Sequence, residues 1–189
     1  DYWASANLTF TTETLEKVTY SVRDLFTATL HYELDPFYGY KNWFMTTPYD
    51  ASVDADRLEE FLKSLEALTI DSAVAADVTD FAQYGLDDPA MTLELVDESG
   101  TFKLCVGDAY TDYYLYCTVN DEPTVYRVAS SAVEFLKTVP LQLTQKYVFL
   151  VNLTYVDSVD ISGLIDMNLS IDHDLQLDED GNPVTNSSG

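Results

Sequence analysis

Basic residues are scarce in this chain, and their scarcity excludes several classes of partner. Lys and Arg number 9 among 189 residues, against 33 Asp and Glu, so the formal net charge is −24. Proteins that bind nucleic acid use clustered Lys and Arg to displace counterions from the phosphates, and anionic lipid surfaces repel an acidic protein. We therefore expect no nucleic-acid partner and no attachment to anionic membranes.

Long apolar runs are also missing. The longest, at 147–151, falls well short of the roughly 20 residues that a membrane-spanning helix needs, so we expect no insertion of this segment into a bilayer. The sequence begins at Asp1 with no basic and apolar leader, which predicts either a processed product or a targeting segment and anchor that lie upstream of it. With 47% apolar and 22% charged residues, the composition still supports a folded core.

Cysteine is limited to Cys105 and Cys117, which lack the C-x-x-C spacing of a zinc or redox site. If 101–119 forms a hairpin, Cys105 lies opposite about Tyr114, and Cys117 lies further along the second strand. A disulfide needs Cα atoms within roughly 7 Å of each other. We therefore predict two buried free thiols.

Histidine is equally rare, and no catalytic motif accompanies it. A nucleophilic triad needs a His within reach of Ser or Cys, but His31 lies in a predicted strand and His173 in an acidic stretch, each without a flanking motif. The sequence has no G-x-S-x-G elbow, no phosphate-binding Gly-rich loop and no H-E-x-x-H helix. We expect no enzymatic activity, no cofactor and no metal site. Paired carboxylates of a hydrolase stay open as an alternative, because their spacing is spatial rather than sequential.

The acidic stretch 172–181 suggests a calcium site, since hard cations bind clustered carboxylates. Its spacing does not fit an EF-hand loop. With Gly181 at the sixth position, Gln176 and Ser187 fall at the first and twelfth positions, where carboxylates are needed. A hairpin turn with Gly181 at positive φ is favoured instead.

The clearest helical signature lies at 54–68. Its apolar residues recur at three- and four-residue spacing and form one stripe, and Asp54 or Asp56 can accept the free N–H groups of the first turn. The stripe consists of Leu58, Phe61, Leu62, Leu65 and Leu68.

Two shorter helices are also expected. Residues 131–139 carry apolar residues on one side, and Pro140 is expected to end that helix. A third helix is expected at 79–84, with Gly85 as its left-handed C-terminal cap.

Strand patterns occur in two series, each followed by a helix. Apolar–polar alternation and turn residues predict strands at 18–22, 26–32 and 43–46, then at 91–95, 102–106, 113–119 and 124–128, and further on at 147–151, 155–161 and 166–177. The tetrapeptide Glu-Phe-Leu-Lys occurs in both helices, at 60–63 and at 134–137. We predict an α+β fold of two tandem similar units, each an antiparallel β-meander plus one helix. The units are expected at 1–80 and 81–152, followed by the start of a third strand unit at 153–184 and a disordered tail at 185–189.

Several motifs in the second series resemble a bacterial family. The motifs are Phe-Ala-Gln-Tyr-Gly-Leu-Asp-Asp-Pro-Ala at 81–90, Val-Gly-Asp at 106–108, the pair Tyr113-Tyr114, and Val-Tyr-Arg-Val at 125–128. Together with Trp43, Pro48 and the helix that opens at Ala55-Asp56, they resemble the family called domain of unknown function 4340. The resemblance covers about residues 15–162.

The resemblance implies a location but no chemistry. Such proteins are typically anchored outside the cytoplasmic membrane, and some look like companions of gliding-motility-type ABC transport systems. The resemblance therefore implies an extracytoplasmic place in the cell envelope, and it brings no catalytic residue. The aromatic-rich insertion at 35–42 departs from the family pattern.

Aromatic residues are concentrated in one stretch. They are Tyr32, Phe37, Tyr38, Tyr40, Trp43, Phe44 and Tyr49. Aromatic rings can stack on sugars or anchor a protein partner, so Tyr38, Tyr40 and Trp43 are candidate binding residues. In the alternative reading, Trp43 and Phe44 pack under the helix at 54–68 and the tyrosines shape a long loop.

These observations favour a non-enzymatic extracytoplasmic interaction module. It would display sheet edges and the aromatic loop to a protein or glycan partner of the cell envelope. Two alternatives remain open: an accessory component of an ABC-type transport or gliding-motility-like complex, and a carboxylate-based hydrolase.

Overall fold

The computed structural model describes residues 12–34, 39, 41–146, 156–161 and 167–170. Contacts divide the chain into two compact units, residues 1–146 and residues 147–189. The predicted boundary between 80 and 81 falls inside the first of these units. The predicted strand at 147–151, the acidic stretch at 172–181 and the tail at 185–189 lie outside the described residues.

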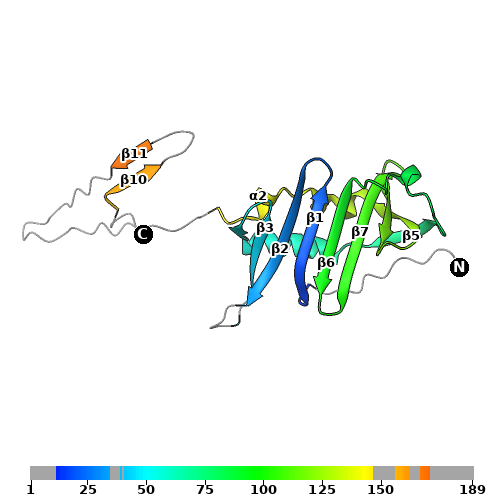
Figure 1. The fold of residues 1–189 in the computed structure, drawn as a ribbon, viewed down its shortest axis with the longest axis horizontal. Coiled ribbons are helices and arrows are strands. Elements are labelled where there is room, and N and C mark those ends of the chain that lie inside the picture. The colour runs from blue at the N-terminus through cyan, green and yellow to red at the C-terminus, as the bar shows by residue number, and fades with distance from the viewer. Residues whose placement is uncertain (1–11, 35–38, 40, 147–155, 162–166, 171–189) are drawn as a thin grey trace, which may run out of the picture. The chain divides into compact units, whose positions relative to one another are not determined.

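The first unit is built on one antiparallel sheet (Figure 1). Its nine strands are β1 (Leu15–Val22), β2 (Phe26–Leu34), β3 (Lys41–Thr47), β4 (Ala51–Ser52), β5 (Ile70–Ala75), β6 (Met91–Asp97), β7 (Gly100–Ala109), β8 (Tyr114–Val119) and β9 (Val125–Ala129). They lie in the order β4-β3-β2-β1-β6-β7-β8-β9-β5. The predicted meander of four strands, β6 to β9, is confirmed, and so is the mainly antiparallel character of the fold.

The two series of strands meet between β1 and β6. Their residues pair from Lys17 opposite Val96 to Val22 opposite Met91, so strands from both predicted units share one continuous sheet. The largest apolar cluster contains residues of both series, such as Val18 and Leu93, so the two predicted units are not separate in their packing. The similarity of the two tandem units stays a prediction.

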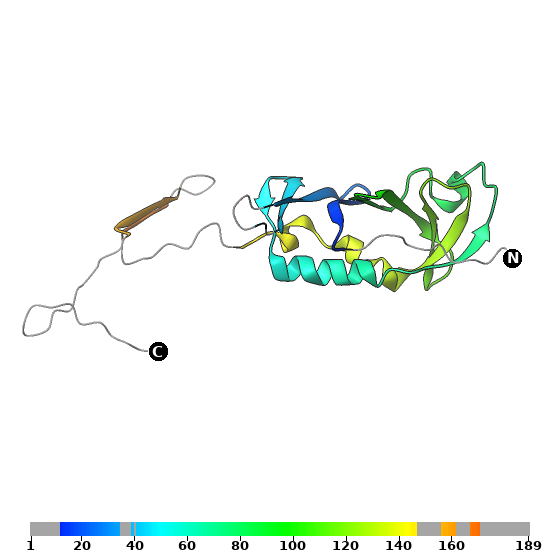
Figure 2. The ribbon, with the colours of Figure 1, turned by 90° about the horizontal axis from the view of Figure 1, so that it is seen from below.

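Two segments cross the same face of this sheet in opposite directions and form what we call the helical layer, α1 and residues 130–143 (Figure 2). Helix α1 (Ala55–Glu66) follows β4 at one edge of the sheet and leads to β5 at the other. The second segment leaves β9 and returns to the first edge, where Thr144 forms an isolated bridge with Val53. The largest apolar cluster lies between this layer and the sheet.

Helix α1 forms where its sequence predicts. The Asp54 carboxylate accepts a hydrogen bond from the Arg57 backbone N–H at 3.1 Å and so caps the first turn. Leu58, Phe61 and Leu65 of the apolar stripe are buried against the sheet. Both the start of the helix and its buried face are therefore confirmed.

The predicted helix at 131–139 is wrong. The chain there forms two 3-10 turns, η2 (Ser130–Ala132) and η3 (Glu134–Lys137), and then a short helix, α2 (Pro140–Leu143). Val133 separates the turns because its φ of −109° and ψ of 4° are not helical. Pro140 begins α2 instead of ending a helix, since proline lacks an N–H that the first helical position does not need.

The short helix expected at 79–84 is confirmed only as the 3-10 turn η1 (Ala82–Tyr84). Gly85 caps it with a φ of 65°, as predicted, and its N–H donates to the Ala82 carbonyl at 3.0 Å. Leu86 then folds back and donates to the Phe81 carbonyl at 3.2 Å. The segment from Phe81 to Leu86 thereby covers the face of the sheet opposite the helical layer, where Leu86 packs with Cys105 and Val125.

The register predicted for the cysteine hairpin is wrong, although the thiols are free and buried as expected. Cys105 lies opposite Thr118 instead of Tyr114, and Cys117 lies opposite Val106. The error arises because β7 continues to Ala109 through an irregularity after Val106. Opposed residues share a face and consecutive residues alternate, so the two thiols point to opposite faces of the sheet.

This arrangement predicts two unreactive thiols. Burial raises the pKa of both Cys105 and Cys117, and the thiolate is the reactive form. We expect the native protein to release almost no thionitrobenzoate from Ellman's reagent at pH 8, and the protein in 6 M guanidinium to release two equivalents. Rapid reaction of either thiol in the native state would contradict the burial described here.

The second unit contains the strands β10 (Ser158–Ile161) and β11 (Met167–Ser170), which pair antiparallel. They fall within the strands expected at 155–161 and 166–177. Val159 lies opposite Leu169, and the two side chains are exposed.

Candidate functional site

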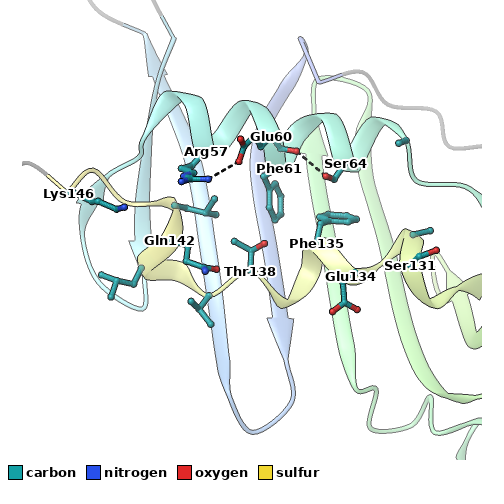
Figure 3. A pocket seen from close by; sticks show the side chains of 15 residues that line it. Arg57, Glu60, Phe61, Ser64, Ser131, Glu134, Phe135, Thr138, Gln142 and Lys146 are labelled. Carbon is teal, nitrogen blue, oxygen red and sulfur yellow. Dashed lines mark hydrogen bonds and ion pairs between the residues drawn. The ribbon is translucent and has the colours of Figure 1, made fainter.

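A groove lies on the outer side of the helical layer, between α1 and the segment that runs back beside it (Figure 3). It encloses about 830 Å³. Helix α1 contributes Arg57, Glu60, Phe61 and Ser64, and its C-cap contributes Ala67. The spacing of three or four residues from Arg57 to Glu60 or Phe61, and on to Ser64 and Ala67, places them along one side of the helix. The opposite wall is formed by side chains from the range 131–146. We call this site the helical-layer groove.

Two phenylalanines form its floor. The rings of Phe61 and Phe135 meet edge to face, with centroids 5.1 Å apart and planes at 78°. Phe61 also contacts the ring of Tyr20 from β1, at 5.0 Å between centroids. The floor therefore continues into the buried core, and its aromatic surfaces are held in fixed orientations.

A buried tyrosine anchors the irregular wall. The Tyr20 hydroxyl donates a hydrogen bond to the Thr138 carbonyl at 2.9 Å. Thr138 lies between η3 and α2, where regular helical hydrogen bonds are absent. Burial, and to a smaller extent the nearby Tyr49, raises the pKa of Tyr20 far above its ordinary value of 10.0. The neutral hydroxyl is thus kept as a donor that positions the wall.

The rim of the groove carries exposed apolar side chains. Leu141 is 71% exposed and Val139 is 45% exposed, and both line the groove on either side of Pro140. Exposed apolar residues that adjoin a groove mark interaction surfaces more often than isolated ones do. Phe61 is only 3% exposed, so the apolar contact area of the groove comes from the half-buried Phe135 and from the rim.

The polar residues of the groove are mostly paired. The Arg57 guanidinium contacts the Glu60 carboxylate at 3.1 Å, and Ser64 donates to the Glu60 carbonyl at 3.0 Å. Glu134 contacts the Lys137 ammonium at 2.8 Å. The ranges 54–68 and 131–146 hold four of the nine basic residues and only six of the 33 acidic ones. The groove therefore lies in a part of the chain that is less acidic than the chain as a whole.

The predicted binding residues are only partly within the described structure. Trp43 lies in β3, where it is half-buried, packs against the core and meets the ring of Tyr32 at 5.9 Å between centroids. This agrees with the alternative in which Trp43 packs in the core. Tyr38 and Tyr40 lie outside the described residues, so their role in recognition stays a prediction.

Neither histidine belongs to a catalytic arrangement among the described residues. The His31 imidazole lies 3.3 Å from the Glu33 carboxylate at the surface of β2, and His173 falls outside the described residues. Within the described ranges, no group of three or more His, Cys, Asp or Glu side chains is placed to hold a metal ion.

The most specific of the family-like motifs meet in one close contact. A Cβ atom added to Gly107 of β7 would overlap the Tyr84 carbonyl oxygen and lie 2.9 Å from the carbonyl carbon of Gly85. A Cβ atom added to Gly85 would fall 2.5 Å from the Asp108 carboxyl carbon. The motifs at 81–90 and 106–108 thus meet in a close packing of two backbones, which we call the glycine crossing.

Fold and site together define a mostly antiparallel β protein with few helices, in which the helical layer of the nine-stranded sheet carries a groove. The family model described as "Domain of unknown function (DUF4340)" matches residues 43–185, and the chain belongs to this family. The match contains α1, the groove and the glycine crossing. The matched range begins within β3 and so leaves out β1 and β2. It therefore begins and ends later than the range of about 15–162 that the sequence motifs predict. No curated protein and no solved structure matches the chain.

Proposed function

We propose that this chain is a non-enzymatic interaction module that binds a protein partner in the helical-layer groove. The observation that carries the proposal is the combination of an ordered aromatic floor, Phe61 with Phe135, and exposed apolar residues at the rim, Val139 and Leu141. Aromatic anchors surrounded by apolar contacts dominate the binding energy of protein interfaces.

The polar groups of the groove support binding more than catalysis. Each of its two carboxylates already has a cation from its own segment, Glu60 from Arg57 and Glu134 from Lys137. A glycosidase needs one carboxyl group as proton donor and a second as base or nucleophile, with the sugar between them. We therefore assign no chemical step to the groove, and the hydrolase alternative receives no support from it.

The proposed location is the cell envelope, outside the cytoplasmic membrane. The family resemblance supports this location and favours a role as an accessory component of an envelope transport or motility complex. No helix in the described part of the chain combines the length and the hydropathy that crossing a membrane requires.

A paired-bait pull-down from solubilised envelopes, with partners identified by mass spectrometry, tests the proposal. We expect Leu141→Glu to reduce capture of the partner by ten-fold or more, because a buried apolar rim contact would become a buried charge. Leu25→Glu is the matched control, since Leu25 is 75% exposed in the turn between β1 and β2. It should leave capture unchanged.

Two outcomes would contradict the proposal. Equal capture by Leu141→Glu and the parent protein would place the partner elsewhere on the surface. Loss of capture with Tyr38→Ala/Tyr40→Ala, and not with Leu141→Glu, would instead support the aromatic loop as the recognition surface.

A further inference from the structure

The two ends of the helical-layer groove differ in charge. Because α1 and the segment beside it run in opposite directions, Arg57 in the first turn of α1 lies at the same end as Lys146 (Figure 3). Ser131 and Glu134 line the other end, beside Phe135. Counted over the lining residues, Arg57, Lys146 and Glu60 leave a net charge of +1 at one end (two cations and one anion), and Glu134 leaves −1 at the other. Asp54 and Asp56 lie beside Arg57 at the start of α1 but do not line the groove.

The two cationic side chains at this end can still bind an anionic group. Arg57 uses its Nη1 on Glu60, and a guanidinium has five N–H donors. Lys146 is exposed, and the described part of the chain provides it with no ion-pair partner. Two cations that face one groove attract an anionic group of an occupant at contact distance, where screening by salt is weakest.

The walls provide side-chain contacts but no free backbone ladder. The N–H and carbonyl groups of α1 are paired inside the helix, and the opposite wall uses short local bonds, such as Leu136 to Val133 at 3.1 Å and Thr138 to Phe135 at 3.0 Å. An extended peptide would lie in the groove with unpaired backbone groups. A helix satisfies its own backbone and needs only an apolar stripe, which is what the floor can receive.

The length of the groove agrees with a helical occupant. Its residues on α1 and the C-cap of this helix extend from Arg57 to Ala67, and the 12 residues of α1 extend about 18 Å at 1.5 Å per residue. A helix of about three turns would match that length and present three or four apolar side chains at i, i+3, i+4 and i+7.

From these observations we infer that the occupant of the groove is an amphipathic helix of another protein, with an acidic residue at the end that meets Arg57 and Lys146. Its apolar stripe covers Phe61 and Phe135 and contacts Leu141. This inference rests on the proposed function and specifies the chemistry of the partner. The net charge of −24 by itself favours a basic partner, so the sign of the charge on the helix is a discriminating property.

Three synthetic helical peptides provide the test. They share one 16-residue Ala- and Leu-rich sequence with a single Leu stripe and differ only in their first turn, which holds two Glu, two Gln or two Lys residues. Fluorescence anisotropy measures their binding. We expect the Glu peptide to bind about ten-fold more tightly than the Lys peptide, as two exposed ion pairs together allow.

Charge reversal in the protein completes the test. Lys146→Glu is expected to abolish or invert the preference for the Glu peptide, whereas Lys17→Glu should leave it intact. The control makes the same change in net charge, but Lys17 lies in β1 and pairs with Glu94 of β6. A shift in preference with both variants would indicate a long-range field rather than contact with Lys146, and would overturn the inference.

The remaining outcomes are also decisive. Absence of binding by all three peptides, or tightest binding by the Lys peptide, overturns the inference. Failure of this inference is distinguishable from failure of the proposed function. If only the inference fails, Leu141→Glu still reduces capture of the natural partner. If the proposed function fails, Leu141→Glu leaves that capture unchanged.

Discussion

Replacing Gly107 with alanine is expected to lower the free energy of unfolding by about 3 kcal/mol, the upper end of what overpacking of a well-packed site costs. The added Cβ would overlap the Tyr84 carbonyl oxygen and press on the carbonyl group of Gly85. Both obstacles are backbone atoms, which cannot rotate away as a flexible side chain can. Urea unfolding at pH 7, followed by circular dichroism, measures the loss.

Alanine substitutions at two other glycines distinguish the cost of steric overlap from the cost of backbone strain. Gly85 has a φ of +65°, and its Cβ would meet the flexible Asp108 carboxylate. Gly39 has a nearly equal φ of +70° with no atom within 4 Å. Alanine at Gly39 should cost only the strain of a left-handed residue, about 1–2 kcal/mol, and alanine at Gly85 somewhat more. A loss at Gly107 no larger than that at Gly39 would contradict the crossing described here.

The glycine crossing also explains why motifs far apart in sequence support one family resemblance. The run at 81–90 and the Val-Gly-Asp step at 106–108 have no chemistry in common, but they contact each other backbone to backbone. The absence of a side chain at Gly107 and the left-handed turn at Gly85 are requirements of this contact. These motifs therefore carry information about the fold.

Local patterns were sufficient for elements that depend on local interactions. The cap at Asp54 and the buried stripe of α1 follow from spacing within the helix, and β6 to β9 follow from alternation and short turns. The Glu-Phe-Leu-Lys tetrapeptide shows the limit, because it is α-helical at 60–63 and a 3-10 turn at 134–137. Neighbouring residues and tertiary contacts decide between those two conformations.

Long-range features could not be predicted in the same way. The pairing of β1 with β6 joins strands about 75 residues apart, and alternation alone does not specify a partner strand. The helical-layer groove likewise exists only because α1 and 131–146 lie side by side. A weak signal was present: two apolar residues, Val139 and Leu141, flank Pro140.

Stability is expected to fall steeply as pH rises above 9. Burial raises the pKa of the Cys117 thiol from 9.0 to about 12, and it raises the pKa of Tyr20 far above 10.0. In the unfolded chain these groups ionise near pH 9 and pH 10, whereas the folded protein keeps their protons. The folded state then binds more protons than the unfolded state, so the free energy of unfolding decreases with pH. It does not change through these groups below pH 9.

The size of this loss of stability follows from the pKa shifts of the two groups. Each group contributes about 1.4 kcal/mol per pH unit once the unfolded state ionises. Between pH 9 and pH 11, Cys117 and Tyr20 together should remove about 4 kcal/mol, a large part of the stability of an ordinary domain. Urea unfolding under reducing conditions, at half-unit steps from pH 8 to pH 11, measures this loss.

Two substitutions assign the loss of stability at alkaline pH to individual residues, because each residue begins to contribute at a different pH. Cys117→Ala should remove most of the part that begins near pH 9 and leave a smaller part from Cys105, whose pKa burial also raises, and Tyr20→Phe should remove the part that begins near pH 10. Tyr20→Phe should also cost about 1–3 kcal/mol at pH 8, because the Thr138 carbonyl loses its buried donor. Tyr113→Phe, at a side chain that is 78% exposed, serves as the control. A free energy of unfolding that stays constant from pH 8 to pH 11 would contradict the burial of both groups, and with it the hydrogen bond that positions the groove wall.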